Sequence, residues 1–123
     1  MKKLTDLEIE KKIESLQDWD YYENGLHTDF EFDNFKDCMS AMNRIAFECE
    51  ALNHHPEWKN TYNKLDIKLT THDAGGVTLL DFKLATIINQ IVEVEEELNI
   101  CQKKILKKNY NLPVSFPFCM KLV

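Results

Sequence analysis

The chain has 123 residues, of which 44% are hydrophobic and 29% charged, and its formal net charge is −6. This length and composition predict one globular domain with a hydrophobic core and a soluble surface. The acidic balance argues against non-specific nucleic-acid binding, which needs a basic surface, but leaves a protein partner open.

The sequence carries no sign of secretion or of membrane insertion. The first 16 residues contain no continuous apolar run, so we expect no signal peptide. No segment reaches the ~18 apolar residues that a membrane span needs. No Cys-x-x-Cys pair occurs among the cysteines, which are Cys38, Cys49, Cys101 and Cys119. We therefore expect reduced, buried thiols in an intracellular protein of the cytoplasm or the nucleus.

A helix and a hairpin are the first elements expected in chain order. The helix starts at Thr5, or at the aspartate after it, and runs to about residue 16. Its apolar stripe is Leu4, Leu7, Ile9, Ile13 and Leu16. Asn24-Gly25 then suits a type I′ turn, whose central residues take positive φ, and predicts a hairpin of strands 18–24 and 26–32. Side chains typical of strands flank this turn: Trp19, Tyr21, Leu26, Phe30 and Phe32.

A second helix, a second hairpin and a long last helix follow. Asp33 is expected to cap the second helix. The apolar residues of that helix recur three and four apart: Phe35, Cys38, Met39, Met42, Ile45, Ala46, Cys49 and Leu52. The next strands are expected at 57–63 and 65–71. Gly75-Gly76 interrupts the chain, and the last helix begins near Thr78. Its inward stripe is expected to be Leu79, Phe82, Ala85, Ile88, Ile91 and Val92.

This order of elements, α-β-β-α-β-β-α, predicts the α+β fold class, with a four-stranded antiparallel sheet and helices packed on one face. Two hairpins leave such a sheet with free edges. Since an exposed edge strand pairs readily with another copy, we expect a homo-oligomer to be accessible to this chain.

The C-terminal part of the chain has a different character. It extends the last helix through an acidic and then a basic stretch and ends in an apolar tail with Pro113 and Pro117. Residues 95–97 and 103–108 can form a solvated helix face, or the tail can pack on a neighbouring molecule, and the sequence leaves both open. We therefore divide the chain into a domain of residues 1–92 and a C-terminal extension of residues 93–123.

Histidine supplies the distinctive chemistry of this sequence, which has four such residues. His54 and His55 are adjacent and precede Pro56, and His72 stands in a Thr-His-Asp segment. His27, in the first hairpin, is expected to be structural. For the adjacent pair taken alone, a structural role is also open, because a histidine often caps a helix or fills a polar niche.

A metal site is disfavoured by the spacing. His54, His55 and His72 would supply nitrogen ligands, with Glu50 or Asp81 as a carboxylate. Adjacent side chains rarely aim at one point, and the helical His-x-x-x-His spacing is missing. We therefore expect no metal.

Acid–base catalysis fits these residues better. Imidazole titrates near neutral pH, so one ring can donate a proton while another accepts one. Like charges within one cleft push neighbouring titrations apart, which supplies an acid and a base at the same pH. Glu50 lies four residues before His54, so a continuing helix would place its carboxylate one turn behind that ring.

The combined pattern in residues 48–85 is more specific than any of its parts. It has a glutamate, three residues, His-His-Pro and aromatic residues, then a hydroxyl residue before a histidine, and an aspartate that opens the last helix. The matching residues are Glu50, His54, His55, Pro56, Trp58, Tyr62, Thr71, His72 and Asp81. In this the chain resembles the pterin-4a-carbinolamine dehydratases, also known as dimerization cofactor of a homeodomain transcription factor. The resemblance covers about residues 4–92, including the LQDWD segment with Trp19.

The resemblance implies the same fold and the dehydration of 4a-hydroxytetrahydropterin to quinonoid dihydropterin, which recycles the pterin of aromatic amino acid hydroxylases. It implies that His54, His55 and His72 are catalytic, without assigning acid and base. The residues implied to hold the pterin substrate are Asn53, His54, His55, Thr70, Thr71, His72 and Asp73. Glu50 and Asp81 would orient imidazoles, while Trp19 would either wall the pocket or pack in the core.

The resemblance implies no metal or organic cofactor. Family members usually assemble as dimers or tetramers, and some bind a helical dimerization segment of a transcription factor. A protein-binding coactivator is therefore the alternative function. The chain departs from the family pattern at Asn53, where Asp is common, at Leu80, where a basic residue is frequent, and at Asp73, where Glu is common. The extension 93–123 has no counterpart in compact members.

Overall fold

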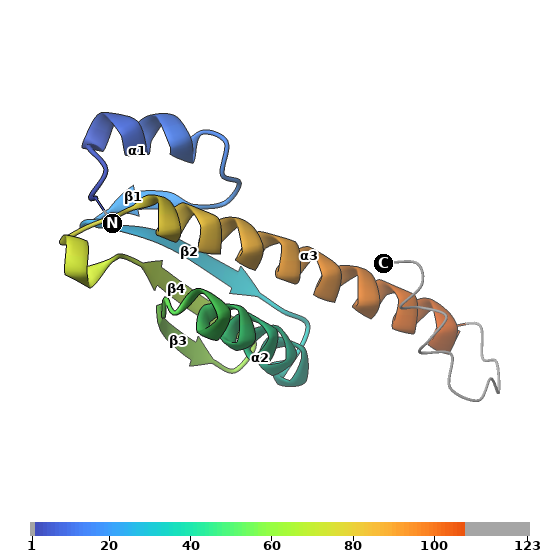
Figure 1. The fold of residues 1–123 in the computed structure, drawn as a ribbon. Helices are drawn as coiled ribbons and strands as arrows, with labels where there is room; N and C mark the ends of the chain where they lie inside the picture. Colours follow the sequence, from blue (N-terminus) through green and yellow to red (C-terminus); the bar gives the residue numbers. More distant parts are fainter. Residues whose placement is uncertain (1, 108–123) are drawn as a thin grey trace.

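The structure is a computed structural model that describes residues 2–107, with side chains described up to Glu97 (Figure 1). Its elements are α1 (Asp6–Ile13), β1 (Asp20–Tyr22), β2 (Gly25–Glu31), α2 (Phe35–Leu52), β3 (Glu57–Thr61), β4 (Lys64–Leu69), the 3-10 helix η1 (His72–Ala74) and α3 (Leu79–Lys107). The α+β class and the order of helices and strands expected from the sequence are confirmed.

The four strands form one antiparallel sheet in the order β1-β2-β4-β3. Alternate residues of β2 and β4 are buried on one face: Leu26, Thr28, Leu65, Ile67 and Leu69. Residues between them, such as Asp29 and Asp66, are exposed on the other face. The helices lie against the apolar face (Figure 1), so the expected one-sided packing is confirmed. In the described part of the chain, β1 and β3 are the end strands of the sheet.

The core lies between the sheet and the helices. The fully buried apolar helix residues are Ile9 of α1, Cys38, Ala41 and Ile45 of α2, and Leu84, Ala85 and Ile88 of α3. Four residues expected on the apolar stripes are exposed and lie outside this core: Leu7, Phe35, Ala46 and Leu79. Leu7 is 78% exposed because it stands two positions, about 200° of helical rotation, from Ile9. Leu79 is 51% exposed because the first turn of α3 directs Asp81 inward instead.

Local hydrogen bonds define where the helices begin. Thr5 caps α1 as expected, since its Oγ1 accepts from the backbone N–H of Glu8 at 3.3 Å and its own N–H donates to the Glu8 carboxylate at 3.2 Å. α1 ends at Ile13 rather than near residue 16. α2 is capped by Asn34 and not by Asp33, because the Asn34 side chain accepts from the backbone N–H of Asp37 at 2.9 Å.

The first hairpin turns one residue earlier than expected. Its central residues are Glu23 and Asn24, with φ of 47° and 57°, and Tyr22 pairs with Gly25. Gly25 is therefore a strand residue, and a Cβ atom there would lie 2.9 Å from Cε of Lys68. The strands β1, β3 and β4 are also shorter than expected.

The acidic stretch of α3 is only partly a solvated face. Glu96 and Glu97 are exposed, but Glu95 is 5% exposed. Its carboxylate accepts hydrogen bonds from Ser40 Oγ at 3.0 Å and from Arg44 Nη1 at 3.2 Å, both on α2. The solvated face, one of the two interpretations left open by the sequence, therefore does not include Glu95, because this carboxylate joins the two helices.

Several expectations concern parts of the chain outside this description. The apolar tail with Pro113 and Pro117, and Cys119, lie outside the described residues, and the Cys101 side chain lies outside the described side chains. Within residues 2–107, none of the helices combines the length and the apolar character that crossing a membrane requires.

Candidate active site

His54 enters the molecule because the chain reverses directly after α2. Asn53 ends the helix in the left-handed conformation, with φ 50° and ψ 44°, and its N–H donates to the carbonyl groups of Cys49 and Glu50. Asparagine adopts this conformation more readily than most residues, which gives Asn53 a local structural role. The N–H of His54 donates to the carbonyl oxygen of Cys49 at 3.0 Å, and the His54 side chain is buried.

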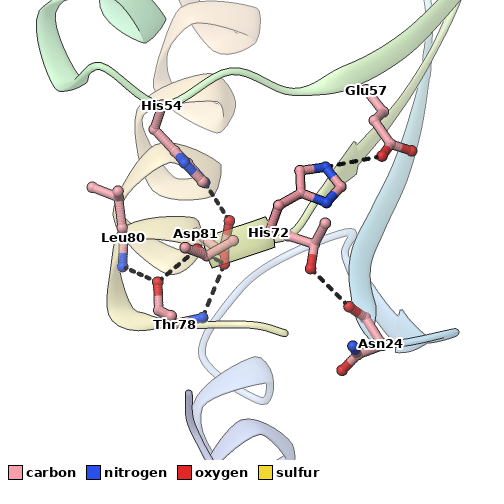
Figure 2. Close-up of polar contacts among 9 residues, drawn as sticks. Asn24, His54, Glu57, His72, Thr78, Leu80 and Asp81 are labelled. Atoms are coloured by element: carbon pink, nitrogen blue, oxygen red, sulfur yellow. Dashed lines mark hydrogen bonds and ion pairs between the residues drawn. The ribbon is translucent and has the colours of Figure 1, made fainter. Parts of the chain in front are cut away.

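Asp81 is the buried partner of His54. The distance from His54 Nε2 to Asp81 Oδ1 is 2.5 Å. The other carboxylate oxygen, Oδ2, accepts from Thr71 Oγ1 at 2.8 Å and from the Thr78 N–H at 2.9 Å (Figure 2). A fully buried carboxylate needs such donors, because an unpaired buried charge is costly. Since a carboxylate only accepts hydrogen bonds, Nε2 of His54 carries a hydrogen and Nδ1 is left as its free ring nitrogen.

His55 lies at the surface and pairs with Glu50. Its Nε2 is 2.9 Å from Glu50 Oε1, and both side chains are exposed. The expectation that Glu50 stands one turn behind His54 is wrong. α2 ends at Leu52, and the reversal at Asn53 brings His55 rather than His54 to this carboxylate.

His72 begins η1 and faces a carboxylate that the sequence did not reveal. Its Nε2 is 3.3 Å from Oε1 of Glu57, the first residue of β3 (Figure 2). The two side chains are 76% and 55% exposed, so water screens this ion pair. Glu57 is the first residue of β3 and pairs with Lys68 of β4, so the hairpin itself brings it close to the segment after β4 that carries His72. The sequence predicted this hairpin but did not single out Glu57.

The loop that carries His72 is braced by the first hairpin. Thr70 Oγ1 donates to the carbonyl oxygen of Asn24 at 3.0 Å, and Asn24 Nδ2 donates to the carbonyl oxygen of Gly75 at 2.8 Å (Figure 2 draws the first contact). Thr71 forms a β-bridge with Gly76. The hydroxyls of Thr70 and Thr71 thus have protein partners, whereas Asp73 is exposed. The sequence indicated Asn24 only as a turn residue.

Two contacts join the histidine-bearing segments. Asp81 connects His54 to Thr71, and Glu57 connects to His72. Segments 53–57 and 70–73 therefore lie together near the start of α3, and each of the three candidate rings meets a carboxylate through Nε2.

Trp19 lies apart from this arrangement. Its indole is buried in the core, and its Nε1 donates to Oδ1 of Asn89 on α3 at 2.8 Å. Of the two roles left open by the sequence, the structure therefore favours core packing over a pocket wall.

The open face of the sheet carries a cavity of about 370 Å³ that adjoins the candidate site at Glu57. Its lining includes Tyr22, His27, Glu57 and Lys68, but not the three candidate histidines. The His27 ring stacks on Tyr22 at 3.8 Å, and its Nε2 lies 3.0 Å from the Tyr22 carbonyl oxygen. His27 thus has the local, structural contacts expected of it.

The described cysteines offer no nucleophile. Cys38 and Cys49 are buried free thiols on α2, as expected. Burial raises the pKa of both thiols, and with the nearby charges of Glu48 and Glu50 it raises the pKa of Cys49 to about 11. Both therefore stay protonated at neutral pH and are poor nucleophiles. Among the described residues, no group of three or more histidine, cysteine or acidic side chains is placed to hold a metal ion.

The fold and the site define the class: a small α+β protein in which three histidines each face a carboxylate. Comparison with known proteins makes this specific. The family model for pterin 4 alpha carbinolamine dehydratase matches residues 2–91. The chain belongs to this family, whose members are hydro-lyases.

Individual relatives and a solved structure agree with the family model. A protein of Christiangramia forsetii, named provisionally as a pterin-4-alpha-carbinolamine dehydratase, is 52% identical over 93 residues, which are 76% of this chain and 96% of that protein. A protein of the same name from Chelativorans sp. is 46% identical over 89 residues, covering 71% and 91% of the two chains. A crystal structure from Brucella melitensis, described as a transcriptional coactivator/pterin dehydratase, aligns with a TM-score of 0.71 and 36% identity, covering 72% of this chain and 97% of that one.

Proposed function

We propose that this protein is a 4a-hydroxytetrahydrobiopterin dehydratase. It would eliminate water from pterin-4a-carbinolamine to give quinonoid dihydropterin and so serve tetrahydrobiopterin recycling. Membership of the family supports the reaction. The observation that carries the mechanism is that three imidazoles from two joined segments each pair with a carboxylate through Nε2.

The reaction needs two proton transfers. The C4a hydroxyl leaves as water once an acid protonates it, and a base removes the N5 proton as the C4a=N5 double bond forms. A positioned acid or base typically contributes ~10²–10⁴-fold to the rate. An imidazole can serve in either role near neutral pH. The net reaction consumes no proton and no electron, so the proposal requires no metal and no organic cofactor.

In this proposal His54, His55 and His72 carry the proton transfers. Because Nε2 of each ring engages a carboxylate, Nδ1 is the nitrogen that would meet the substrate. Segments 53–55 and 70–73 would hold the pterin, with the exposed Asn53 and Asp73 at the two ends of the site. The hydroxyls of Thr70 and Thr71 donate to protein oxygens, which favours a role of these two residues in shaping the loop.

The proposed assembly is a homo-oligomer, a dimer or a tetramer, in the cytoplasm or the nucleus. The end strands β1 and β3 are available for pairing with another copy, and free, buried Cys38 and Cys49 suit a reducing compartment. A coactivator role without catalysis is the alternative. The name of the Brucella melitensis relative mentions that role, and no contact in the described residues favours it.

A stopped-flow absorbance assay with chemically generated 4a-hydroxytetrahydropterin tests the proposal. Spontaneous dehydration provides the baseline. We expect the wild-type protein to accelerate it and His55→Ala to lose about 100-fold or more of that acceleration.

His27→Ala is the matched control, because His27 contacts Tyr22 and not the candidate site. It should retain wild-type turnover. A well-folded wild-type protein that gave no acceleration would refute the dehydratase proposal and favour the coactivator. Equal loss in both variants would refute the assignment of His55.

A further inference from the structure

A chain of hydrogen bonds extends from His54 through Asp81 to the start of α3. The carboxylate of Asp81 accepts from Thr71 Oγ1 at 2.8 Å. Thr71 Oγ1 lies 2.9 Å from Oγ1 of Thr78, and that oxygen lies 3.3 Å from the backbone N–H of Leu80 (Figure 2). Thr78 is completely buried at the start of α3.

The chemistry of the groups fixes the direction of this chain. A carboxylate oxygen only accepts, so the single hydroxyl hydrogen of Thr71 points to Asp81. Thr71 can then only accept from Thr78, so the Thr78 hydrogen points to Thr71. The Leu80 N–H donates to the Thr78 oxygen. Each donor therefore polarises the next, from Leu80 through the two hydroxyls to Asp81, in a buried setting where such networks are strengthened.

Thr78 also reaches Asp81 by a second route. Its backbone N–H donates to the same oxygen, Oδ2, at 2.9 Å. This bond and the Leu80 contact form a reciprocal cap on the first turn of α3. The helix start is thus joined to the carboxylate that orients His54.

We propose that Thr78 is a positioning residue of the active site: its hydroxyl, acting through Thr71 and Asp81, fixes the orientation and the Nε2–H tautomer of His54. The inference rests on the proposed dehydratase function, and it adds a residue that does not touch substrate. The Nδ1 atom of His54 is kept available only while Asp81 is held against Nε2.

A double-mutant cycle tests the order of the chain, with turnover measured in the dehydration assay on the full-length protein. Thr71→Val should lower kcat, and Thr78→Val should lower it by about 3- to 10-fold, the effect of one hydrogen bond. Because Thr78 acts through Thr71, adding Thr78→Val to Thr71→Val should cause no further loss. Thr78→Ser, which keeps the hydroxyl, should restore most of the turnover.

A spectroscopic readout separates positioning from a general loss of structure. In ¹H–¹⁵N spectra of histidine-labelled protein, His54 should appear as the Nε2–H tautomer. Its ring proton should exchange with water faster in Thr78→Val than in wild type. Thr86→Val is the matched control, because the Thr86 hydroxyl on the same helix donates only to its own helix, at Phe82 O. Melting temperatures confirm that each variant is folded at the assay temperature.

Each result has a definite meaning. Non-additive losses of kcat together with faster exchange at His54 would establish the proposal. Additive losses, an unchanged His54 signal despite slower turnover, or no effect of Thr78→Val would overturn it. If wild-type protein failed to accelerate dehydration while the His54 signal responded as expected, the dehydratase function would fall and the positioning role of Thr78 would stand.

Discussion

At the scale of single residues, the contact between Glu57 and His72 is the one to which the sequence assigned no role. Glu57 completes the pattern in which each candidate imidazole faces a carboxylate. Like the pair of His55 and Glu50, its pair with His72 is exposed to solvent. A carboxylate at Nε2 favours the tautomer that leaves Nδ1 free, whether or not the pair adds to stability. Glu57 therefore has a test in which activity and stability should separate.

We predict that Glu57→Ala lowers kcat about 2- to 10-fold and leaves the urea unfolding midpoint nearly unchanged, because an exposed ion pair contributes only about 0–1 kcal/mol to stability. The kcat of Glu57→Gln should lie between those of the wild type and Glu57→Ala, since the amide oxygen of glutamine still accepts from Nε2–H of His72 but carries no charge. Turnover in the dehydration assay checks both. Glu31→Ala, an exposed acid on β2, is the control. Equal turnover in Glu57→Ala and Glu31→Ala would show that the contact with His72 is incidental.

The residues of the site differ in how far the sequence could predict them. His54, His55 and His72 stand out because histidine is scarce and two are adjacent. Their carboxylate partners depend on geometry. Glu50 would face His54 only if α2 continued past Leu52. Because Asn53 is left-handed and ends the helix, Glu50 faces His55 instead. Thr78 gives no signal of its own beyond a helix start. Its link to Asp81 appears only in three dimensions.

At the scale of elements, α2 and α3 are joined by more than apolar packing. Glu95 is buried on α3 and accepts from Ser40 and Arg44 of α2, and the Arg44 side chain is partly exposed. A buried carboxylate that loses its cationic partner keeps the cost of burial without the compensating attraction. The strength of this contact can therefore be measured by removing Arg44.

We predict that Arg44→Ala lowers the free energy of unfolding by about 1–3 kcal/mol, because among the described side chains Glu95 then keeps only Ser40 as a donor. Urea denaturation followed by circular dichroism measures this. Arg44→Met combined with Glu95→Leu should recover most of the loss, since an apolar pair of similar volume needs no compensation. Lys36→Ala, which removes an exposed lysine from the same helix, is the control. A loss in Lys36→Ala equal to that in Arg44→Ala would indicate a general helix effect.

Element types were predictable from periodicity, and their ends were not. Apolar spacing identifies α2 and α3, because the residues that share a helix face are fixed by 3.6 residues per turn. The ends depend on single hydrogen bonds. Asn34 rather than Asp33 accepts from Asp37, and the first hairpin turns at Glu23 and Asn24 with Gly25 already paired in a strand. Neighbouring residues of similar turn preference cannot be ranked without those bonds.

At the scale of the whole molecule, one-sided packing decides where the site lies. The helices cover the apolar face of the sheet, and the start of α3 places Asp81 against both His54, just before β3, and Thr71, just after β4. The pairing of β3 with β4 brings these two loops to the same end of the sheet. α3 then continues to Lys107, past Val92, which is the last core residue among the side chains described up to Glu97. The Christiangramia forsetii relative aligns over 93 residues, which are 96% of its length, so the compact relatives lack most of this continuation.

We propose that the folded unit ends beyond residue 92, because Glu95 belongs to the contact between α2 and α3. A chain truncated after residue 97 should keep the wild-type unfolding midpoint and turnover. A chain truncated after residue 92 should lose about 1–2 kcal/mol of stability, since Ser40 and Arg44 lose their acceptor and the last helical turn over the core is shortened. Urea denaturation and the dehydration assay check both truncated chains. Because Glu95→Ala in the full-length protein removes the same carboxylate without shortening α3, it should reproduce most of the loss in the shorter chain. If truncation after 97 destabilised the protein as much as truncation after 92, residues 98–123 would themselves contribute to the fold, and the extension would have to be counted as part of the domain.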